Sequence, residues 1–278
     1  MIYLILAILC SALISVLMRI SQEKRKSDIG MFIFNYAVCS ILGLIYTPLG
    51  NISFHTEKIP YTIILGVVSG VLYLASFALF QQGIKKNGIV LASIFMKLGV
   101  LIPVLMSIII FRESPKILQI IGIVLSIAAI IVFNFDKKGM SAGGKIVLLI
   151  LLLVVSGFAD SMVNIYNKIG NSSLSDCFLF LTFFFAGISS LVLYFVKKEK
   201  MGWWDVLFGV VIGIPNYFSS RFLLLALRSV PAVVTYPVYS VATILVITLV
   251  GILAFKEPIS KQKIIGLILV VAAVAALA

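Results

Sequence analysis

The chain has 278 residues, of which 62% are hydrophobic and only 12% are charged, and its mean hydropathy is +1.21. A soluble domain carries about 25% charged residues, so this composition excludes a soluble fold and predicts an all-α integral membrane protein. The net charge of +12 does not indicate nucleic-acid binding, because the Lys and Arg residues cluster between apolar runs, where they anchor helix ends and meet anionic headgroups.

Ten apolar runs predict ten membrane-spanning helices, because each is near the ~20 residues that cross a bilayer and backbone groups in lipid need partners within their own segment. The first run has no basic segment before it, so we expect a retained span rather than a cleaved signal peptide. In chain order the runs cover residues 2–20, 30–48, 61–84, 88–111, 117–135, 145–166, 176–196, 205–227, 231–254 and 261–278.

The two halves of the chain repeat one another at an offset of 144 residues. We therefore predict two repeats of five helices, residues 1–139 and 140–278. Because five is an odd number, the second repeat must cross the membrane in the opposite sense, and inverted repeats of this kind are typical of secondary transporters. The matching segments are Phe111-Arg112-Glu113 with Phe255-Lys256-Glu257, Ile120-Ile121-Gly122 with Ile264-Ile265-Gly266, Tyr73 with Tyr217, and Ser76 with Ser220.

The charges of the connecting loops agree with inversion. The odd-numbered loops carry fifteen Lys and Arg residues, whereas the even-numbered loops carry five. The first loop of the first repeat is rich in basic residues, and its counterpart in the second repeat holds only Lys168. By the positive-inside rule the odd loops are cytoplasmic and both termini lie outside.

The segments Phe111–Gly122 and Phe255–Gly266 resemble the EamA domain of the drug/metabolite transporter superfamily. In that family each five-helix half ends with a long helix, a short glutamate-containing turn and a final helix with a glycine near its start. The resemblance covers both halves and implies a secondary transporter of small metabolites, with a central cavity lined by helices 1–4 and 6–9 and with helices 5 and 10 at the periphery. It also implies cytoplasmic termini, which the loop charges do not favour, so the orientation stays open.

Three ionisable side chains lie well inside the predicted spans, away from their ends: Lys97, Asp160 and Arg221. Each costs at least ~2.5 kcal/mol at the bilayer centre, so we expect each to face the interior and to have a function. Lys97 aligns with Val241 and Arg221 with Phe77, so these two cations break the repeat, as a substrate site does. Asp160 and Arg221 share a depth, and a salt bridge between them is open to two interpretations, a structural ion pair or a gate. For Lys97 two interpretations stay open: burial as a neutral amine, or contact with the substrate.

Polar and aromatic residues near two proline breaks complete the predicted substrate site. Pro215 and Pro237 free backbone carbonyls in mid-span, which is tolerated where a helix lines a cavity. For any single tyrosine the alternative is packing or anchoring at the membrane interface. The predicted site residues are Asn35, Tyr73, Ser93, Lys97, Asp160, Asn216, Tyr217, Arg221, Tyr236 and Tyr239.

Other shared features are interpreted as scaffold. We expect the pairs Gly66 with Gly70 and Gly209 with Gly213 to provide close helix packing. Glu113 and Glu257, with Lys116 and Lys261, are expected to cap the starts of the spans at 117–135 and 261–278.

Two cations and one anion in the spans favour an anionic or zwitterionic substrate: an amino acid, an organic acid or a phosphorylated metabolite. We therefore predict a secondary transporter working by alternating access, and we expect Lys97→Met to abolish transport. The chain has no ATP-binding motif, so a gradient of protons or of a counter-substrate is expected to drive it, with Asp160 as a candidate proton carrier. The alternative is a flippase for a lipid-linked or phospholipid headgroup.

A membrane-embedded enzyme is a remote alternative, because the chain has a single histidine and Asp160 is the one carboxylate well inside a predicted span. We expect no enzymatic activity, no cofactor and no metal site, and we assign the three cysteines to packing. The expected partners are a small-molecule substrate and the lipid bilayer, in a multi-pass protein of a bacterial plasma membrane. The sequence does not predict the oligomeric state.

Overall fold

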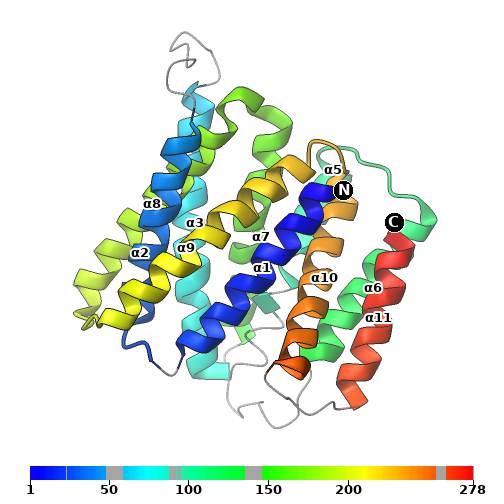
Figure 1. Ribbon diagram of the computed structural model, residues 1–278. Coiled ribbons are helices and arrows are strands. Elements are labelled where there is room, and N and C mark those ends of the chain that lie inside the picture. Colours follow the sequence, from blue (N-terminus) through cyan, green and yellow to red (C-terminus); the bar gives the residue numbers. More distant parts are fainter. Residues whose placement is uncertain are drawn as a thin grey trace. The chain divides into compact units, whose positions relative to one another are not determined.

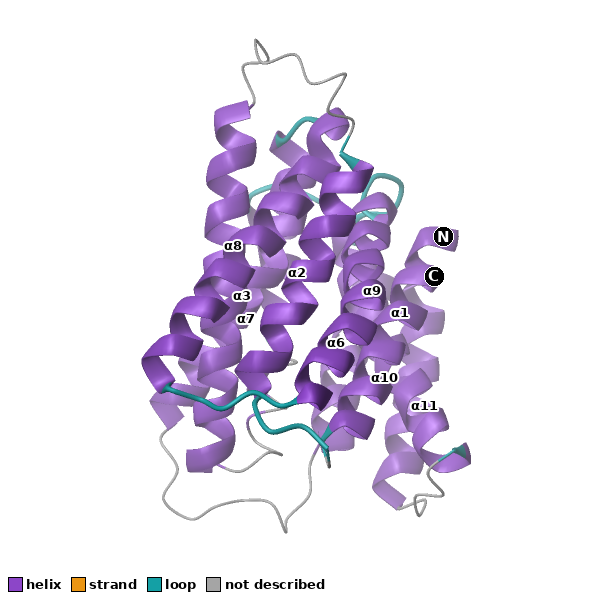
Figure 2. Cartoon of the chain, turned by 60° about the vertical axis from the view of Figure 1, so that its left-hand side comes forward, coloured by secondary structure: helices purple, strands orange, loops and turns teal. Residues whose placement is uncertain are grey.

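A computed structural model describes residues 1–22, 24–47, 59–87, 92, 95–96, 98–134, 146–254 and 261–277 (Figure 1). These residues form helices joined by short turns, and Figure 2 shows no strand among them. The helices are α1 (Ile2–Ser21), α2 (Asp28–Tyr46), α3 (Ile59–Asn87), α5 (Leu101–Ile109), α6 (Ile117–Asn134), α7 (Ile146–Ile169), η3 (Ser172–Leu174), α8 (Ser175–Lys197), α9 (Trp203–Ala226), α10 (Ala232–Leu253) and α11 (Lys261–Leu277).

Nine of the ten predicted spans coincide with one helix each, with bounds that differ by a few residues. Seven of the described helices are long and apolar enough to cross a membrane. Two more are shorter apolar helices, Ile117–Val132 and Ile264–Leu277, and the predicted span 88–111 is described in part, through α5. The chain is therefore a multi-pass membrane protein, and the number ten stays a prediction.

The helices group into two compact units that do not follow the boundary at residue 139. One, called here the α2 unit, consists of Ile2–Leu74 and Met162–Ala226. The other, the α10 unit, consists of Ala75–Ser161 and Leu227–Ala278, with Met1. Each unit contains helices from both halves of the sequence. The two repeats, residues 1–139 and 140–278, and their inversion stay predictions.

Glycines allow the helices of the α2 unit to approach closely. In this unit α2 packs against both α8 and α9, and α9 also packs against α1. A Cβ atom on Gly213 would lie 2.8 Å from the Asn35 carbonyl oxygen, and one on Gly70 would lie 2.6 Å from the Thr182 carbonyl oxygen. These contacts join α9 to α2 and α3 to α8, which confirms the predicted packing role of the glycine pairs.

Replacing Gly213 with valine is expected to destabilise the protein by about 1–3 kcal/mol, because the new side chain meets backbone that cannot move aside. The measurement is the thermal midpoint and the monodisperse yield of purified protein in detergent. Gly187→Ala is the matched control, because a Cβ there meets only Tyr36 Cβ at 3.4 Å, an ordinary contact. Equal losses in the two variants would contradict the close-packing argument.

One end of the α2 unit is closed by a buried carboxylate, Asp205, at the start of α9. Its oxygens accept N–H groups from Lys26 at 2.8 Å, Ser27 at 3.2 Å and Gly202 at 2.7 Å, and the residue is fully buried. Because it bonds to the loop before α2 as well as to its own turn, Asp205 ties two loops of distant sequence together.

Asp205→Ala is expected to lower the stability by about 3 kcal/mol, because three backbone N–H groups lose a charged acceptor. Thermal unfolding in detergent measures the loss. Asp28→Ala is the control: this carboxylate is 34% exposed in its pair with Arg25, so removing it should cost less than about 1 kcal/mol. A similar shift in both variants would count against a special role for Asp205.

In the α10 unit, α6 and α11 lie side by side, and α10 contacts α5, α6 and α11 (Figures 1 and 2). Gly122 of α6 lies against α11, since a Cβ there would be 2.6 Å from Leu277 Cγ. This repeated glycine is therefore a packing position, as the sequence predicts.

Glu113 was predicted to cap the start of α6, but its carboxylate binds the start of a different helix, α10. After α5 the chain reverses at Arg112, whose φ is 53°, and the Glu113 N–H donates to the Ser107 carbonyl at 2.9 Å. This reversal brings the Glu113 carboxylate to the first turn of α10, where it accepts the Val233 N–H at 3.1 Å. The start of α6 is capped instead by Gln119, whose side chain accepts the Lys116 N–H at 2.9 Å. Glu257 lies outside the described residues.

Candidate functional site

Four side chains from three helices form a charged and aromatic group in the α2 unit, called here the Arg221 cluster. Arg221 Nε lies 2.6 Å from Asp176 Oδ1, and its NH2 group lies 3.2 Å from Oδ2, so the guanidinium binds the carboxylate through two hydrogen bonds. Tyr217 donates its hydroxyl to Asp176 Oδ1 at 3.3 Å. The ring of Tyr46 lies under the guanidinium, with its centroid 4.3 Å from Arg221 Cζ, and stacks on Tyr217.

The helix boundaries explain why these residues meet. Tyr46 is the last residue of α2, Asp176 lies in the first turn of α8, and Arg221 lies near the end of α9. Because a short turn joins α8 to α9 and both pack on α2, the start of α8 and the ends of α2 and α9 fall at one level. Asp205 is 16 residues before Arg221 on α9, roughly 24 Å along the helix, so the cluster and the Asp205 contacts mark opposite ends of the α2 unit.

The cluster is held strongly and remains accessible. The side chains of Arg221 and Asp176 keep 25% and 21% of their surface exposed, whereas Tyr217 is buried. A guanidinium that is fixed by an aromatic face presents a planar fork of donors that matches a carboxylate or a phosphate. The arrangement is therefore able to exchange the Asp176 carboxylate for an anionic group of a ligand.

A second polar group lies deeper in the same unit. Asn216 Nδ2 donates to Asn35 Oδ1 at 2.8 Å, and Asn35 is almost fully buried. The Cys39 thiol donates to the Gly213 carbonyl at 3.2 Å and approaches Asn35 Oδ1 at 3.4 Å. On α9, Gly213 lies about one helical turn before Tyr217, and Asn216 lies about one turn before Arg221, so these polar groups extend the cluster toward the middle of the span.

The structure brings five of the ten predicted site residues together in the α2 unit. They are Arg221, Tyr217, Asn216, Asn35 and Tyr73, the last of which contacts Phe183 at a centroid distance of 6.4 Å, while Phe183 lies 6.3 Å from Tyr217.

The remaining predicted residues are elsewhere. Tyr236 and Asp160 meet in the α10 unit, where the Tyr236 hydroxyl donates to the Asp160 backbone carbonyl at 2.9 Å. Tyr239 lies on α10 and is partly buried. Ser93 and Lys97 lie outside the described residues.

The ion pair predicted for Arg221 has a different carboxylate. The sequence analysis placed Asp160 at the level of Arg221, whereas in the structure the guanidinium binds Asp176 through both its Nε and NH2 groups. The reason is that depth along a span does not determine which helices are neighbours, and α8 packs against the same helix, α2, as α9 does.

Sequence analysis missed Asp176 and Tyr46 as site residues. Neither residue was singled out in the sequence, although both lie within predicted spans, 176–196 and 30–48. One signal was available for Asp176: it is the only carboxylate in the first turn of α8 and follows a polar serine-rich segment, so it enters the membrane at the level where α9 carries Arg221.

Among the residues that the structure describes, no three His, Cys, Asp or Glu side chains are grouped as a metal site requires.

Comparisons with known proteins agree with these features. Residues 1–135 match the EamA-like transporter family, and residues 175–270 match the family described as Small Multidrug Resistance protein. An uncharacterized protein of Haemophilus influenzae is 26% identical over 281 residues, which cover 98% of this chain and 95% of that protein. A solved crystal structure matches 99% of this chain and 94% of its own, with a TM-score of 0.79 and 14% identity, a likeness that shows the fold alone.

Proposed function

Because residues 1–135 match the EamA-like transporter family and residues 175–270 match the Small Multidrug Resistance protein family, we propose that the chain is a secondary transporter of a small anionic or zwitterionic metabolite. The substrate class comprises amino acids, organic acids and phosphorylated metabolites. The observation that carries the proposal is the partly exposed, two-bonded pair of Arg221 and Asp176 within the membrane-spanning helices.

The pair supports this substrate class through charge exchange. Leaving a guanidinium unpaired in a membrane interior is costly, so a ligand that displaces Asp176 must supply a replacement anion. A carboxylate or phosphate does so with the same two-bonded geometry. A zwitterion also supplies an ammonium group for the released Asp176, so it satisfies both partners.

The two ends of the α2 unit support alternating access. At one end, buried Asp205 holds two loops through three backbone N–H groups; at the other, the Arg221 cluster retains exposed surface. We propose that substrate reaches Arg221 from the exposed end while the Asp205 end is closed, and that the two repeats then exchange conformations. A gradient of protons or of a counter-substrate drives this exchange, with Asp160 and Asp176 as the carboxylates proposed to carry a proton, in a bacterial plasma membrane.

Uptake by proteoliposomes tests the proposal. Purified protein is reconstituted and supplied with labelled amino acids, organic acids, sugar phosphates and organic cations, with and without an imposed proton gradient. We expect one anionic or zwitterionic class to accumulate and the cations to be excluded. Uptake of organic cations alone would overturn the proposed substrate class, and transbilayer movement of labelled phospholipid without uptake of any soluble compound would favour the alternative, a headgroup flippase.

A further inference from the structure

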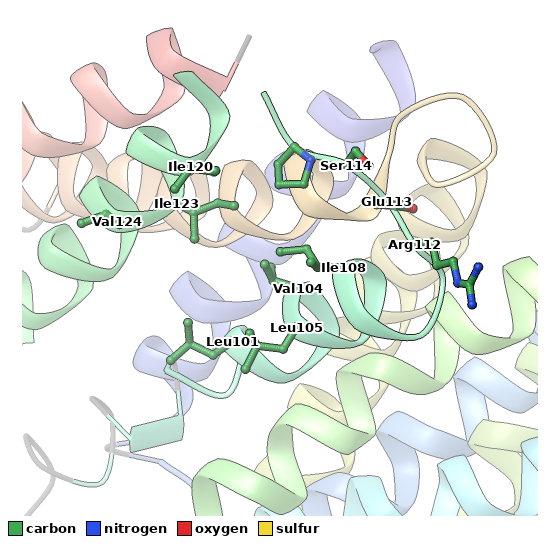
Figure 3. A pocket seen from close by; sticks show the side chains of 11 residues that line it. Leu101, Val104, Leu105, Ile108, Arg112, Glu113, Ser114, Ile120, Ile123 and Val124 are labelled. Atoms are coloured by element: carbon green, nitrogen blue, oxygen red, sulfur yellow. The ribbon is translucent and has the colours of Figure 1, made fainter. Parts of the chain in front are cut away.

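A groove opens on the α10 unit between α5 and α6, and the proposed transport function does not use it. Its volume is about 610 Å³. Figure 3 shows side chains of α5 along one side, side chains of α6 along the other, and the connecting turn at one end. The lining residues are Leu101, Val104, Leu105, Ile108, Arg112, Glu113, Ser114, Pro115, Ile120, Ile123 and Val124.

The walls of the groove are apolar and partly exposed. Leu105 is 48% exposed and Val124 is 59% exposed, and Ile109, Ile110 and Ile117 beside them are exposed further. Because α5 and α6 are apolar helices of a membrane protein, the material that covers such a surface is hydrocarbon.

The length of the groove fits one acyl chain. From Leu101 to Ile108 the helix rises roughly 10 Å, and the turn with Arg112 lies beyond it. One leaflet of the hydrocarbon core is about 15 Å thick, so the groove extends through most of a leaflet and ends at the level of the headgroups.

The polar end of the groove carries a positive charge. Glu113 is bound to the Val233 N–H of α10, whereas the guanidinium of Arg112 forms no ion pair with any residue that the structure describes. In Figure 3 the Arg112 side chain is directed away from the apolar walls, where a headgroup would lie.

Two features indicate that a cation is required at this position. Arg112 has a φ of 53°, a conformation that costs a residue with a Cβ about 1–2 kcal/mol and that glycine adopts freely, so the turn alone does not favour arginine. The other repeat carries Lys256 at the same position. If the repeats are inverted, these two residues face opposite sides of the membrane, so the positive-inside rule does not explain both.

We propose that this groove binds one acyl chain of an anionic phospholipid and that Arg112 binds its phosphate. An arginine matches the phosphate oxygens with two parallel hydrogen bonds, and basic residues at the membrane end of a helix groove favour lipids with a net negative headgroup. The bound lipid covers the exposed faces of α5 and α6 and fixes the turn that carries Glu113 to α10.

Native mass spectrometry of the full-length protein tests the proposal. The protein is titrated with phosphatidylglycerol and with phosphatidylcholine that has the same acyl chains. We expect the wild type to retain phosphatidylglycerol about tenfold more tightly, and Arg112→Gln to lose this preference. Val124→Trp, which fills the groove, should weaken the binding of both lipids. Lys116→Gln is the matched control, because Lys116 is a cation of the same turn that does not line the groove.

Three outcomes would overturn the proposal. Arg112→Gln retains the preference for phosphatidylglycerol, Lys116→Gln loses it to the same extent, or Val124→Cys forms a disulfide-linked dimer in high yield, which would assign the groove to a second copy of the chain. Thermal midpoints measured without added lipid show that the variants remain folded, so a loss of lipid binding is not a loss of structure.

Discussion

Arg221→Gln is expected to reduce the initial rate of substrate uptake by about 10- to 100-fold. Hydrogen bonds to a charged group contribute about 1.5–3 kcal/mol, which corresponds to this range, and glutamine offers neither the charge nor the two-bonded fork. The measurement is uptake into proteoliposomes with equal amounts of reconstituted protein. The double variant Arg221→Gln with Asp176→Asn keeps the site neutral, so its thermal midpoint shows whether a loss of activity reflects an unpaired Asp176 carboxylate.

Two further variants separate charge from geometry and position. Arg221→Lys keeps the charge but loses the planar fork, so we expect an intermediate rate. Arg25→Gln also removes an arginine from an ion pair, since Arg25 Nε lies 2.7 Å from Asp28, but that pair lies in the loop before α2, near the Asp205 end. We expect it to leave uptake unchanged. Wild-type uptake in Arg221→Gln would show that the cluster is only structural and would remove it from the transport site.

The helices could be predicted from the sequence because the lipid bilayer determines the length and the apolar composition of each span. A segment that crosses hydrocarbon must be helical and apolar over a known length, so composition alone locates α1, α2 and α7 to α10 within a few residues. The glycine pairs were predictable for a related reason. A residue without a side chain in an apolar helix indicates close contact, and Gly70 and Gly213 make such contacts with backbone of α8 and α2.

Neighbours in space could not be predicted in this way. Asn35, Asn216 and Arg221 were recognised because polar residues are rare in a span, but their partners depend on which helices pack together. Asp176 was not singled out, because its contact with Arg221 depends on how α8 and α9 pack against each other and against α2. Glu113 was assigned to the nearest helix start, whereas the left-handed turn at Arg112 directs it to α10. Each error concerns a long-range contact rather than a residue type.

The compact units of the structure do not follow the two halves of the sequence. The repeat at an offset of 144 residues records the relation of one sequence half to the other. The packing of the helices depends instead on their apolar surfaces, and α2 from the first half packs against α8 and α9 from the second half. The Arg221 cluster therefore combines both halves of the sequence, since Tyr46 comes from one half and Asp176, Tyr217 and Arg221 come from the other.

Asp176→Asn is expected to change substrate affinity in opposite directions for the two substrate classes that the cluster allows. For an anionic substrate, the variant removes the carboxylate that competes for Arg221, so the affinity should rise about tenfold. For a zwitterionic substrate, Asp176 is the partner of the ammonium group, so the affinity should fall by a similar factor. The amide has the shape of the carboxylate and still accepts the Tyr217 hydroxyl, which preserves the local packing.

The affinities are measured as the concentration dependence of the thermal shift and of uptake, with the compound that the reconstituted transporter accumulates. Asp28→Asn is the control, because it removes a carboxylate from the partly exposed pair with Arg25, at the other end of the α2 unit, and should change neither quantity. A rise in affinity would show that the substrate is an anion and that Asp176 occupies its place at Arg221 in the empty transporter. A fall in affinity would show that the substrate is a zwitterion and that Asp176 binds its ammonium group directly. An affinity within about twofold of the wild type for every transported compound would show that Asp176 neither competes with the substrate nor binds it, and the exchange of partners at Arg221 would then be wrong.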